Sequence, residues 1–339
     1  MRNLLLGTLL LSLAAFAEER PPSELDRGVS LYEAGKYDEA MAVFQALLAA
    51  DPADDAAAYE LAMTYQAKQD FAKCRAIIEP RVFRKGRLQP MMYTVLGNCL
   101  DMAGESKRAI DAYRKGLRIA PNDPQLLFNL AVALAGQKKI DEARELLKKE
   151  VVAAPFHGSG HYFLAQIFDS QGFRAAAAVQ YLRFLSIEAS GERARAGATR
   201  MLELLNLGVE ETGPGKTKIT IDPDSRKEEG DYASFEMMLA ITGVAGRRGE
   251  KAELTEFDRT REQIVTSLTI LTEGGSKGKD YTARNNIPFF ASLIEQKMLD
   301  TAAGLAISSL DLPGTAAWKQ ANTAAIQAYV AWMNAQRRR

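Results

Sequence analysis

The sequence has few of the residues that most catalytic and metal sites use. Its 339 residues include two histidines, His157 and His161, and two cysteines, Cys74 and Cys99. Charge of either sign is not in excess, because Lys plus Arg and Asp plus Glu each number 43. A balance of zero gives no bulk attraction to nucleic acid or to an anionic surface, so we expect no nucleic-acid partner.

Long apolar runs are also lacking, except at the N-terminus. Arg2 precedes an apolar run from Leu4 to Phe16, and Ala15-Phe16-Ala17 has the small-x-small pattern of a cleavage site. The run of about 13 residues is shorter than the roughly 20 that span a bilayer. The sequence therefore predicts a signal peptide over residues 1–17 and a periplasmic or secreted protein with no integral membrane segment after cleavage. A membrane anchor is the alternative.

The chain does contain an internal repeat of about 34 residues, which is clearest from Pro90 to Asp123. Repeats begin at Pro21, Asp55, Pro90, Pro124 and Gly158, at intervals of 34, 35, 34 and 34 residues, as the sequence shows. The repeat from Pro90 has its characteristic residues at places 4, 7, 8, 11, 15, 20, 24 and 32, namely Tyr93, Leu96, Gly97, Leu100, Gly104, Ala109, Tyr113 and Pro121. This pattern resembles the tetratricopeptide repeat, a helix-turn-helix unit.

The resemblance implies an all-α fold, a tetratricopeptide-type helical solenoid. We expect about five repeats over residues 18–208, ending in a capping helix from Glu192 to Leu207. Small residues at places 8 and 20 would let the two helices of a repeat cross closely, and the first helices would build a concave surface. Pro80 falls inside the expected second helix of the second repeat and should shorten or kink it.

Beyond residue 208 the resemblance ends. Residues 209–230 are rich in Gly, Pro and charge, which predicts a linker with one short strand from Lys218 to Ile221. Residues 231–339 regain helical periodicity and predict a C-terminal domain of about five helices. The apolar faces expected there consist of Leu254, Phe257, Ile264, Leu268, Leu271, Ile287, Phe290, Ile294, Met298, Trp318, Ile326, Tyr329 and Met333.

The resemblance also implies a ligand surface, since tetratricopeptide repeats bind peptides mainly through first-helix residues that face the concave side. The residues at those places are Tyr59, Met63, Thr94, Asn98, Asp101, Phe128, Asn129, Tyr162 and Gln166. For each one, packing between helices is the alternative. The partner implied is a peptide or protein segment in the cell envelope.

Two of these residues match a sharper pattern. Repeat domains that hold a peptide C-terminus use Asn at place 9 of one repeat and at place 6 of the next, where Asn98 and Asn129 stand. Their basic partners are missing, because Ser159 and Phe163 occupy the places of Lys and Arg. An amide can both donate to and accept from a peptide backbone, so we expect backbone binding without capture of a terminal carboxylate.

No motif supplies a convincing catalytic or cofactor site. His157 and His161 are four residues apart, as metal ligands on a helix can be, but two glycines separate them and no third ligand follows at a suitable spacing. Gly213–Thr217 lacks the first glycine of a phosphate loop, and Gly274–Gly278 resembles a nucleophile elbow without a histidine downstream. We therefore expect a non-enzymatic scaffold with no cofactor and no metal.

Two alternatives stay open for the function. One is a structural protein that assembles into a homo-oligomer. The other is an envelope hydrolase with its chemistry in the C-terminal domain, although residues 231–339 contain neither His nor Cys.

Cys74 and Cys99 leave a further alternative open. An exported chain meets an oxidising compartment, where the pair can form a disulfide. Both occupy core-type places of adjacent repeats, where small buried free cysteines are the more common alternative.

Overall fold

The computed structural model describes residues 23–207, 209–213, 216–219, 254–273 and 280–338. The expected signal peptide at residues 1–17 and the Gly274–Gly278 motif lie outside these ranges. The chain divides into two compact units, which meet in the sequence between Ala103 and Gly104. Each unit is described by itself.

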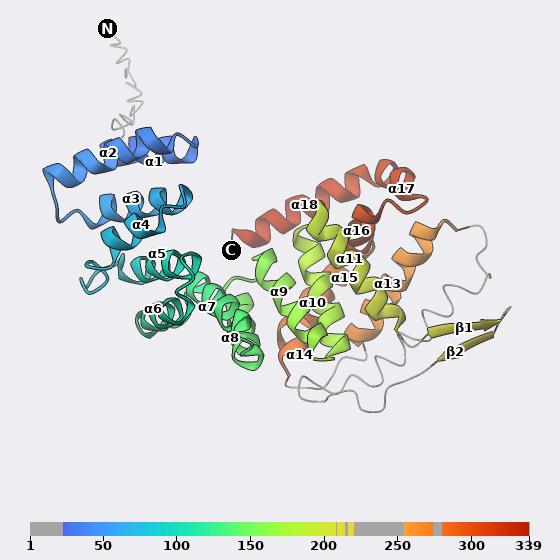
Figure 1. Cartoon of the computed structure of the whole chain (residues 1–339). Coiled ribbons are helices and arrows are strands. Elements are labelled where there is room, and N and C mark those ends of the chain that lie inside the picture. The colour runs from blue at the N-terminus through green and yellow to red at the C-terminus, as the bar shows by residue number, and fades with distance from the viewer. Residues whose placement is uncertain (1–22, 208, 214–215, 220–253, 274–279, 339) are drawn as a thin grey trace, which may run out of the picture. The chain divides into compact units, whose positions relative to one another are not determined.

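Five helix pairs and a capping helix follow one another along the chain, as the repeat predicts (Figure 1). The first unit contains α1 (Glu24–Glu33), α2 (Tyr37–Ala50), α3 (Asp55–Ala67), α4 (Phe71–Ile78) and α5 (Gln89–Met102). The second unit begins with α6 (Ser106–Ile119), α7 (Pro124–Gly136), α8 (Ile140–Ala153), α9 (Gly158–Ser170), α10 (Arg174–Ile187) and α11 (Glu192–Asn206). The prediction of tetratricopeptide-type helical repeats with a terminal helix is confirmed.

Small residues are buried where the repeat places them. The residues at place 20 are Ala40, Cys74, Ala109, Ala143 and Ala177, and all are fully buried. At place 8 of the first repeat, a Cβ added to Gly28 would lie inside the van der Waals radius of the Phe44 ring. Helices α1 and α2 therefore cross at a distance that only glycine permits at this position.

The turn inside each repeat uses one backbone geometry. The residue at place 15 has positive φ in every repeat: Gly35, Gln69, Gly104, Lys138 and Gly172, with φ between 59° and 80°. This left-handed conformation ends the first helix, and it favours glycine. The second and fourth repeats have Gln69 and Lys138 there, so their backbone is strained at this position.

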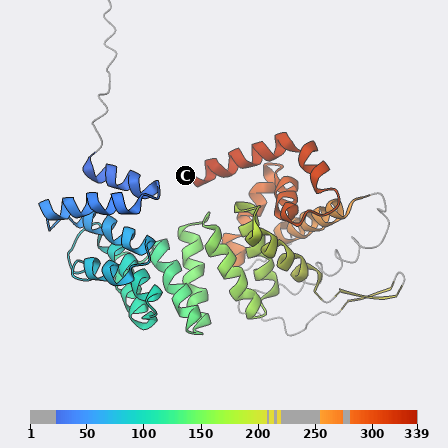
Figure 2. The same ribbon diagram turned by 45° about the horizontal axis from the view of Figure 1, so that its top comes forward.

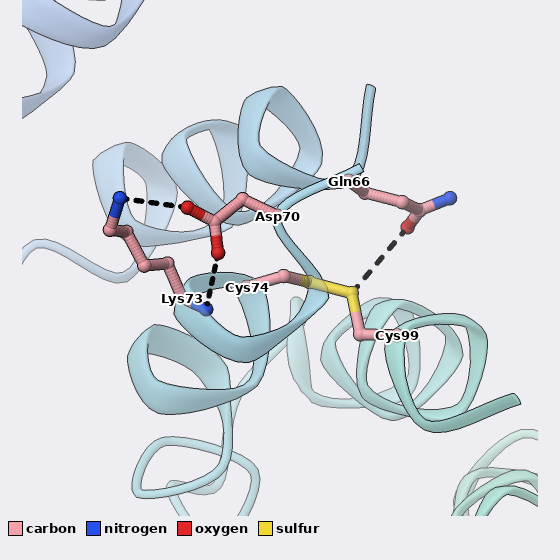
Figure 3. The surroundings of a disulfide bond; sticks show 5 residues. All are labelled: Gln66, Asp70, Lys73, Cys74 and Cys99. Atoms are coloured by element: carbon pink, nitrogen blue, oxygen red, sulfur yellow. Dashed lines mark hydrogen bonds and ion pairs between the residues drawn. A yellow bond between two sulfur atoms is a disulfide. The ribbon is translucent and has the colours of Figure 1, made fainter. Parts of the chain in front are cut away.

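The second repeat departs from the others, as Pro80 predicts. Helix α4 has 8 residues where α2 has 14, and it ends at Ile78. A disulfide between Cys74 and Cys99 joins this short helix to α5 (Figure 3), with their Cα atoms 6.3 Å apart. The structure thus decides between the two alternatives that the sequence left open.

The expected linker contains a two-stranded antiparallel hairpin. Strand β1 (Val209–Gly213) pairs with β2 (Lys216–Ile219), and Val209 lies opposite Ile219. The described part of the strand predicted at Lys218–Ile221 belongs to β2, and its last two residues lie outside the described ranges. Strand β1 was not predicted, because its Glu-Glu-Thr sequence has little strand character. The fold is helical apart from this hairpin, as far as the described residues show.

The described C-terminal helices belong to the second unit and pack on its last repeat (Figures 1 and 2). They are α13 (Glu256–Glu273), α14 (Tyr281–Asn285), α15 (Ile287–Glu295), α16 (Leu299–Ile307), the 3₁₀ turn η2 (Ser308–Leu310), α17 (Thr315–Ala321) and α18 (Thr323–Arg337). Helix α16 contacts α10, α11 and α13. The compact units thus divide at a different place from the boundary expected within residues 209–230.

Helices α15 and α16 repeat the turn geometry of the repeats. Lys297 has φ 56°, and the amides of Gln296, Lys297 and Met298 donate to carbonyls four, three and five residues earlier, as those of Ala34, Gly35 and Lys36 do. Ala302, five residues after Lys297, is buried as Ala40 is. A degenerate repeat-like helical hairpin therefore lies in the C-terminal region, where the sequence does not resemble the repeat.

Most apolar residues expected to face the C-terminal core are buried there, including Phe257, Phe290 and Tyr329. The prediction for Ile294 is wrong, because this side chain is 37% exposed and Leu293 is buried in its place. In the described part of the chain, no helix combines the length and hydropathy needed to cross a membrane.

Candidate peptide-binding surface

The predicted ligand residues of the first unit lie on α3 and α5. Tyr59 and Met63, one helical turn apart on α3, are partly exposed, and so are Asn98 and Asp101 on α5. Thr94 is 8% exposed, and its hydroxyl donates to the Pro90 carbonyl of its own helix at 3.2 Å. Thr94 is thus placed in the packing between helices, which was the alternative for each predicted residue.

In the second unit, Phe128 and Asn129 lie on α7 and both are partly exposed. The Phe128 ring packs edge-on against His157, with centroids 5.0 Å apart, and against Phe163 at 6.3 Å. Asn129 Oδ1 accepts a hydrogen bond from Gln125 Nε2 at 3.1 Å. This part of the surface thus consists of the packed Phe128, Phe163 and His157 rings with the Asn129 amide on the same helix as Phe128.

Tyr162 and Gln166 extend the surface along α9. Gln166 is exposed, whereas Tyr162 is partly covered and packs against Phe184, with centroids 4.8 Å apart. The structure therefore leaves both α9 residues accessible, with Tyr162 held rigidly and Gln166 directed to solvent.

Arg193 of the capping helix is a neighbour of this surface that the repeat pattern did not predict. Its Nη1 donates to Ser159 Oγ at 2.9 Å, and its guanidinium lies 5.7 Å from the centre of the Tyr162 ring. A cation thus reaches the place where the family pattern has Lys. Glu188 already pairs with Arg193 and raises its pKa, so the charge is neutralised within the unit.

The capping helix holds the far end of α9 in the same way. Arg200 forms two hydrogen bonds to the Asp169 carboxylate, at 2.7 and 2.8 Å, and a third to Glu203. A bidentate pair of this kind fixes the orientation of both side chains. We infer that the Arg200–Asp169 pair fixes the position of α11 on α9.

The two histidines have structural partners. His161 is 2% exposed, with Nδ1 2.8 Å from Gln180 Oε1 and Nε2 3.1 Å from the Pro155 carbonyl oxygen. Burial, together with the nearby Arg183 charge, lowers the pKa of His161 to about 4, so the ring is neutral. A neutral imidazole donates only once, and Gln180 uses its NH₂ for the Tyr281 hydroxyl, so we assign the ring proton to Nδ1, which donates to Gln180 Oε1. The Pro155 carbonyl accepts from Arg183 Nη2 at 2.9 Å.

His157 pairs with a buried carboxylate. Its Nδ1 lies 2.6 Å from Oε1 of Glu150, whose side chain is fully buried and whose pKa is raised by desolvation. No group of three His, Cys, Asp or Glu side chains that could hold a metal ion occurs among the described residues. The histidines therefore join the end of α8 to α9 and α10.

A pocket of about 450 Å³ lies away from the predicted ligand residues. Its lining residues come from α6, α7 and α8, and they are Arg114, Leu130, Leu134, Asp141, Glu142, Glu145 and Leu146. Leu130 and Leu134 lie on the side of α7 roughly opposite Phe128, given about 100° per residue. The pocket's acids already contact cations or amides of the same unit, as in the Arg114–Glu142 pair at 2.9 Å.

Helix α10 is covered on every side, which the repeat pattern also did not predict. Twelve of its 14 residues are buried. Its Gln180, Arg183 and Ser186 lie on one face and meet the aromatic rings of the C-terminal helices: Gln180 donates to the Tyr281 hydroxyl, Arg183 lies 3.5 Å from the Phe289 ring centre, and Tyr329 donates to the Ser186 carbonyl. The C-terminal helices thus cover the second helix of the fifth repeat and leave Gln166 of the first helix exposed.

Comparison with known families agrees with the repeat assignment. Residues 31–84 and 102–167 match the family described as Tetratricopeptide repeat. No curated protein sequence matches the chain.

Several solved structures are similar in fold to part of the chain. A thermophilic TPR protein of Thermus thermophilus is 22% identical, covers 54% of this chain with 98% of its own length, and superposes with a TM-score of 0.44. MamA of Desulfovibrio magneticus RS-1, from residue 41 to its end, is 16% identical over 50% of this chain and 95% of its own, with a TM-score of 0.43. YrrB, described as a TPR protein with an unusual peptide-binding site, is 17% identical over 50% of this chain and 87% of its own, with a TM-score of 0.40.

Proposed function

Because the chain is built on tetratricopeptide repeats, we propose that it is a binding scaffold of the cell envelope, which holds an extended peptide or protein segment on the first helices of its repeats. The observation that carries this proposal is the exposure of the predicted ligand residues. Eight of the nine are partly or fully exposed, although they lie on helices whose other faces are buried. Thr94 is left out of the proposed site.

The chemistry of this surface suits a peptide backbone with apolar side chains. Asn98, Asn129 and Gln166 supply amides that both donate and accept, while Tyr59 and Phe128 supply aromatic area. Arg193, the cation that contacts Ser159 and Tyr162 of α9, is already paired with Glu188. The proposed ligand is therefore an internal peptide segment, not a free C-terminus.

Export is supported by two independent features. The first 17 residues have the signal-peptide pattern, and Cys74 and Cys99 form a disulfide. Disulfides persist mainly in oxidising compartments such as the periplasm or the extracellular space. We infer that the scaffold works outside the cytoplasm and as a binding protein, not an enzyme.

To test the proposal, peptides that bind the purified chain are first selected from a random peptide display library. The affinity of the chain for the selected peptides is then measured. The Asn98→Ala, Asn129→Ala double variant should bind selected peptides at least tenfold more weakly, because each lost backbone hydrogen bond contributes about 1 kcal/mol. The matched control is Asn122→Ala with Asn334→Ala, two exposed amides outside the predicted surface. Equal affinity of the intact chain and the first double variant would reject the proposed site.

Folding has to be checked in the same experiment. Both predicted asparagines are partly exposed, so the free energy of unfolding of the double variant should stay within about 1 kcal/mol of the intact chain. Severe unfolding would place these side chains in the core and remove them from the ligand surface.

A further inference from the structure

The segment between α4 and α5, residues 79–88, presents an exposed aromatic ring among positive charges. Phe83 is 72% exposed, the highest value among the large apolar side chains of the described residues. Arg81, Arg84, Lys85 and Arg87 lie within seven residues of sequence around it. We call residues 79–88 the basic loop. Although the net charge of the chain is zero, positive charge is concentrated here.

The basic loop is held firmly against its own unit. Val82, directly before Phe83, is 2% exposed, and its carbonyl accepts a hydrogen bond from Gln89 Nε2 at 2.8 Å. The Arg81 guanidinium donates to the carbonyls of Ile77 and Pro52, at 2.8 and 3.0 Å. Val82 is thus held inside the unit while the next side chain, Phe83, is exposed on the turn.

Two of the cations have no carboxylate partner among the described residues of this unit: Lys85 and Arg87. Arg81 and Arg84, by contrast, both contact Asp55. The remaining cations between residues 23 and 103 are also paired, as Arg27–Glu24, Lys36–Glu39, Lys68–Asp38, Lys73–Asp70 and Arg75–Glu79. The cations without a carboxylate partner in the described part of this unit thus lie within four residues of its most exposed aromatic ring, Phe83.

We propose that the basic loop docks the protein on an anionic lipid surface, with the Phe83 ring in the interfacial layer and Lys85 and Arg87 at the lipid phosphates. Interfacial anchors combine an aromatic or aliphatic side chain with Lys and Arg in this way. A ring that stands out from the surface enters a bilayer interface without any preformed cavity, whereas an acidic protein partner would need a matching pocket. This role is separate from the peptide surface on the first helices.

The expected attachment is weak and reversible. Each Lys or Arg near an anionic bilayer raises the partition coefficient on the order of fivefold. The double variant Lys85→Ala, Arg87→Ala should therefore lose roughly 25-fold in partitioning. Phe83→Ala removes most of the apolar area of the anchor and should lose roughly tenfold.

The test is co-sedimentation with phosphatidylglycerol-containing vesicles and with neutral phosphatidylcholine vesicles. The chain used begins at Glu18, because the apolar run before it would bind lipid by itself, and this removes none of the described helices. We expect binding to the anionic vesicles alone, weakened by salt, and reduced in both variants by the stated factors. The charge-matched control, Lys36→Ala with Lys68→Ala, should bind within about threefold of the intact chain.

Depth of insertion gives a second readout. In a Phe83→Trp variant, lipids with brominated acyl chains should quench the added fluorescence, over the signal from Trp318 and Trp332 of the parent chain. Failure of the parent chain to bind anionic vesicles better than neutral ones would overturn the proposal. So would equal binding by the parent chain and the Lys85→Ala, Arg87→Ala variant.

Discussion

At the scale of single residues, the turn at place 15 of the repeat shows how backbone and sequence conflict. Gln69 and Lys138 adopt positive φ, at 59° and 62°, where the other repeats have glycine. A left-handed conformation costs a residue with a side chain about 1–2 kcal/mol. Glycine avoids this cost, but it loses more chain entropy on folding, which costs about 0.5–1 kcal/mol. The difference is small, which explains why two repeats can do without glycine.

Lys138→Gly is therefore expected to raise the free energy of unfolding of the second unit by about 0.5–1 kcal/mol. The side chain of Lys138 is exposed, so nothing else should change. Gly172→Ala is the matched reverse test, because a Cβ there meets no atom within 4 Å and only the backbone is strained. Urea unfolding should show opposite shifts for the two variants, and shifts of the same sign would contradict this explanation.

The buried histidine gives a prediction for pH. Burial lowers the pKa of His161 from 6.5 to about 4 in the folded chain. Because the folded value is the lower one, the neutral ring stabilises the fold above pH 6.5, and this contribution is lost as the pH falls toward 4, by about 3 kcal/mol in total. His161→Gln should lose less stability than the intact chain between pH 7.5 and pH 4. Equal losses in urea unfolding at the two pH values would show that His161 is not the titrating group.

At the scale of elements, the disulfide compensates for a short helix. Helix α4 ends six residues earlier than its length in other repeats would allow, and Cys74 near its middle is bonded to Cys99 of α5. A cross-link over a separation of 25 residues is expected to contribute about 3.5 kcal/mol by constraining the unfolded chain. The disulfide therefore holds α4 against α5, although Pro80 makes α4 shorter than the second helices of the other repeats.

The Cys74→Ala, Cys99→Ala double variant should accordingly lose about 3 kcal/mol of stability in the first unit. Hydrogen exchange measured by mass spectrometry should rise in α3, α4 and α5. Exchange in α10 and α16, which belong to the other unit, should stay as in the intact chain. A uniform rise along the whole chain would contradict the division into two units.

The elements differ in how far the sequence predicted them. The five repeats were predicted from their constant spacing and their resemblance to the tetratricopeptide repeat, whose small residue at place 20 is the one that close packing requires. Pro80 predicted the short α4, since proline removes a helix hydrogen bond. The cover over α10 was missed, although RAAAAVQYLRFLSI has no broad polar face and such a helix is usually buried all round. Thr94 was misplaced because the repeat pattern gives a direction, not the depth of neighbouring side chains.

At the scale of the whole molecule, the C-terminal helices extend the core of the last repeats. Gly304 of α16 lies so close to the Trp318 ring of α17 that an added Cβ would overlap it. Since α16 also contacts α10 and α11, strain at this point should reach the repeats. In the second unit, the C-terminal helices thus pack on the same repeats that carry the predicted ligand residues. No motif in the sequence predicted this packing.

Gly304→Ala is expected to destabilise the second unit by about 1–3 kcal/mol, because overpacking moves a buried ring. Hydrogen exchange should rise in α10 and α16 together if the unit opens as one body. The control is Gly86→Ala, where no atom lies within 4 Å of the added Cβ. A rise confined to α16 and α17 would mean that the C-terminal helices are energetically independent of the repeats.

The central claim is that the first helices of the repeats hold a peptide. Site-specific photo-crosslinking in the native envelope tests it most directly, with the crosslinker placed in turn at Met63 and Gln166 on first helices and at Ile119 and Val152 on second helices, where those side chains are 45% and 54% exposed. The two first-helix positions should each capture a partner protein, and the two second-helix positions should not. Capture from Ile119 and Val152 alone, or capture of a second copy of this chain at every position, would contradict it.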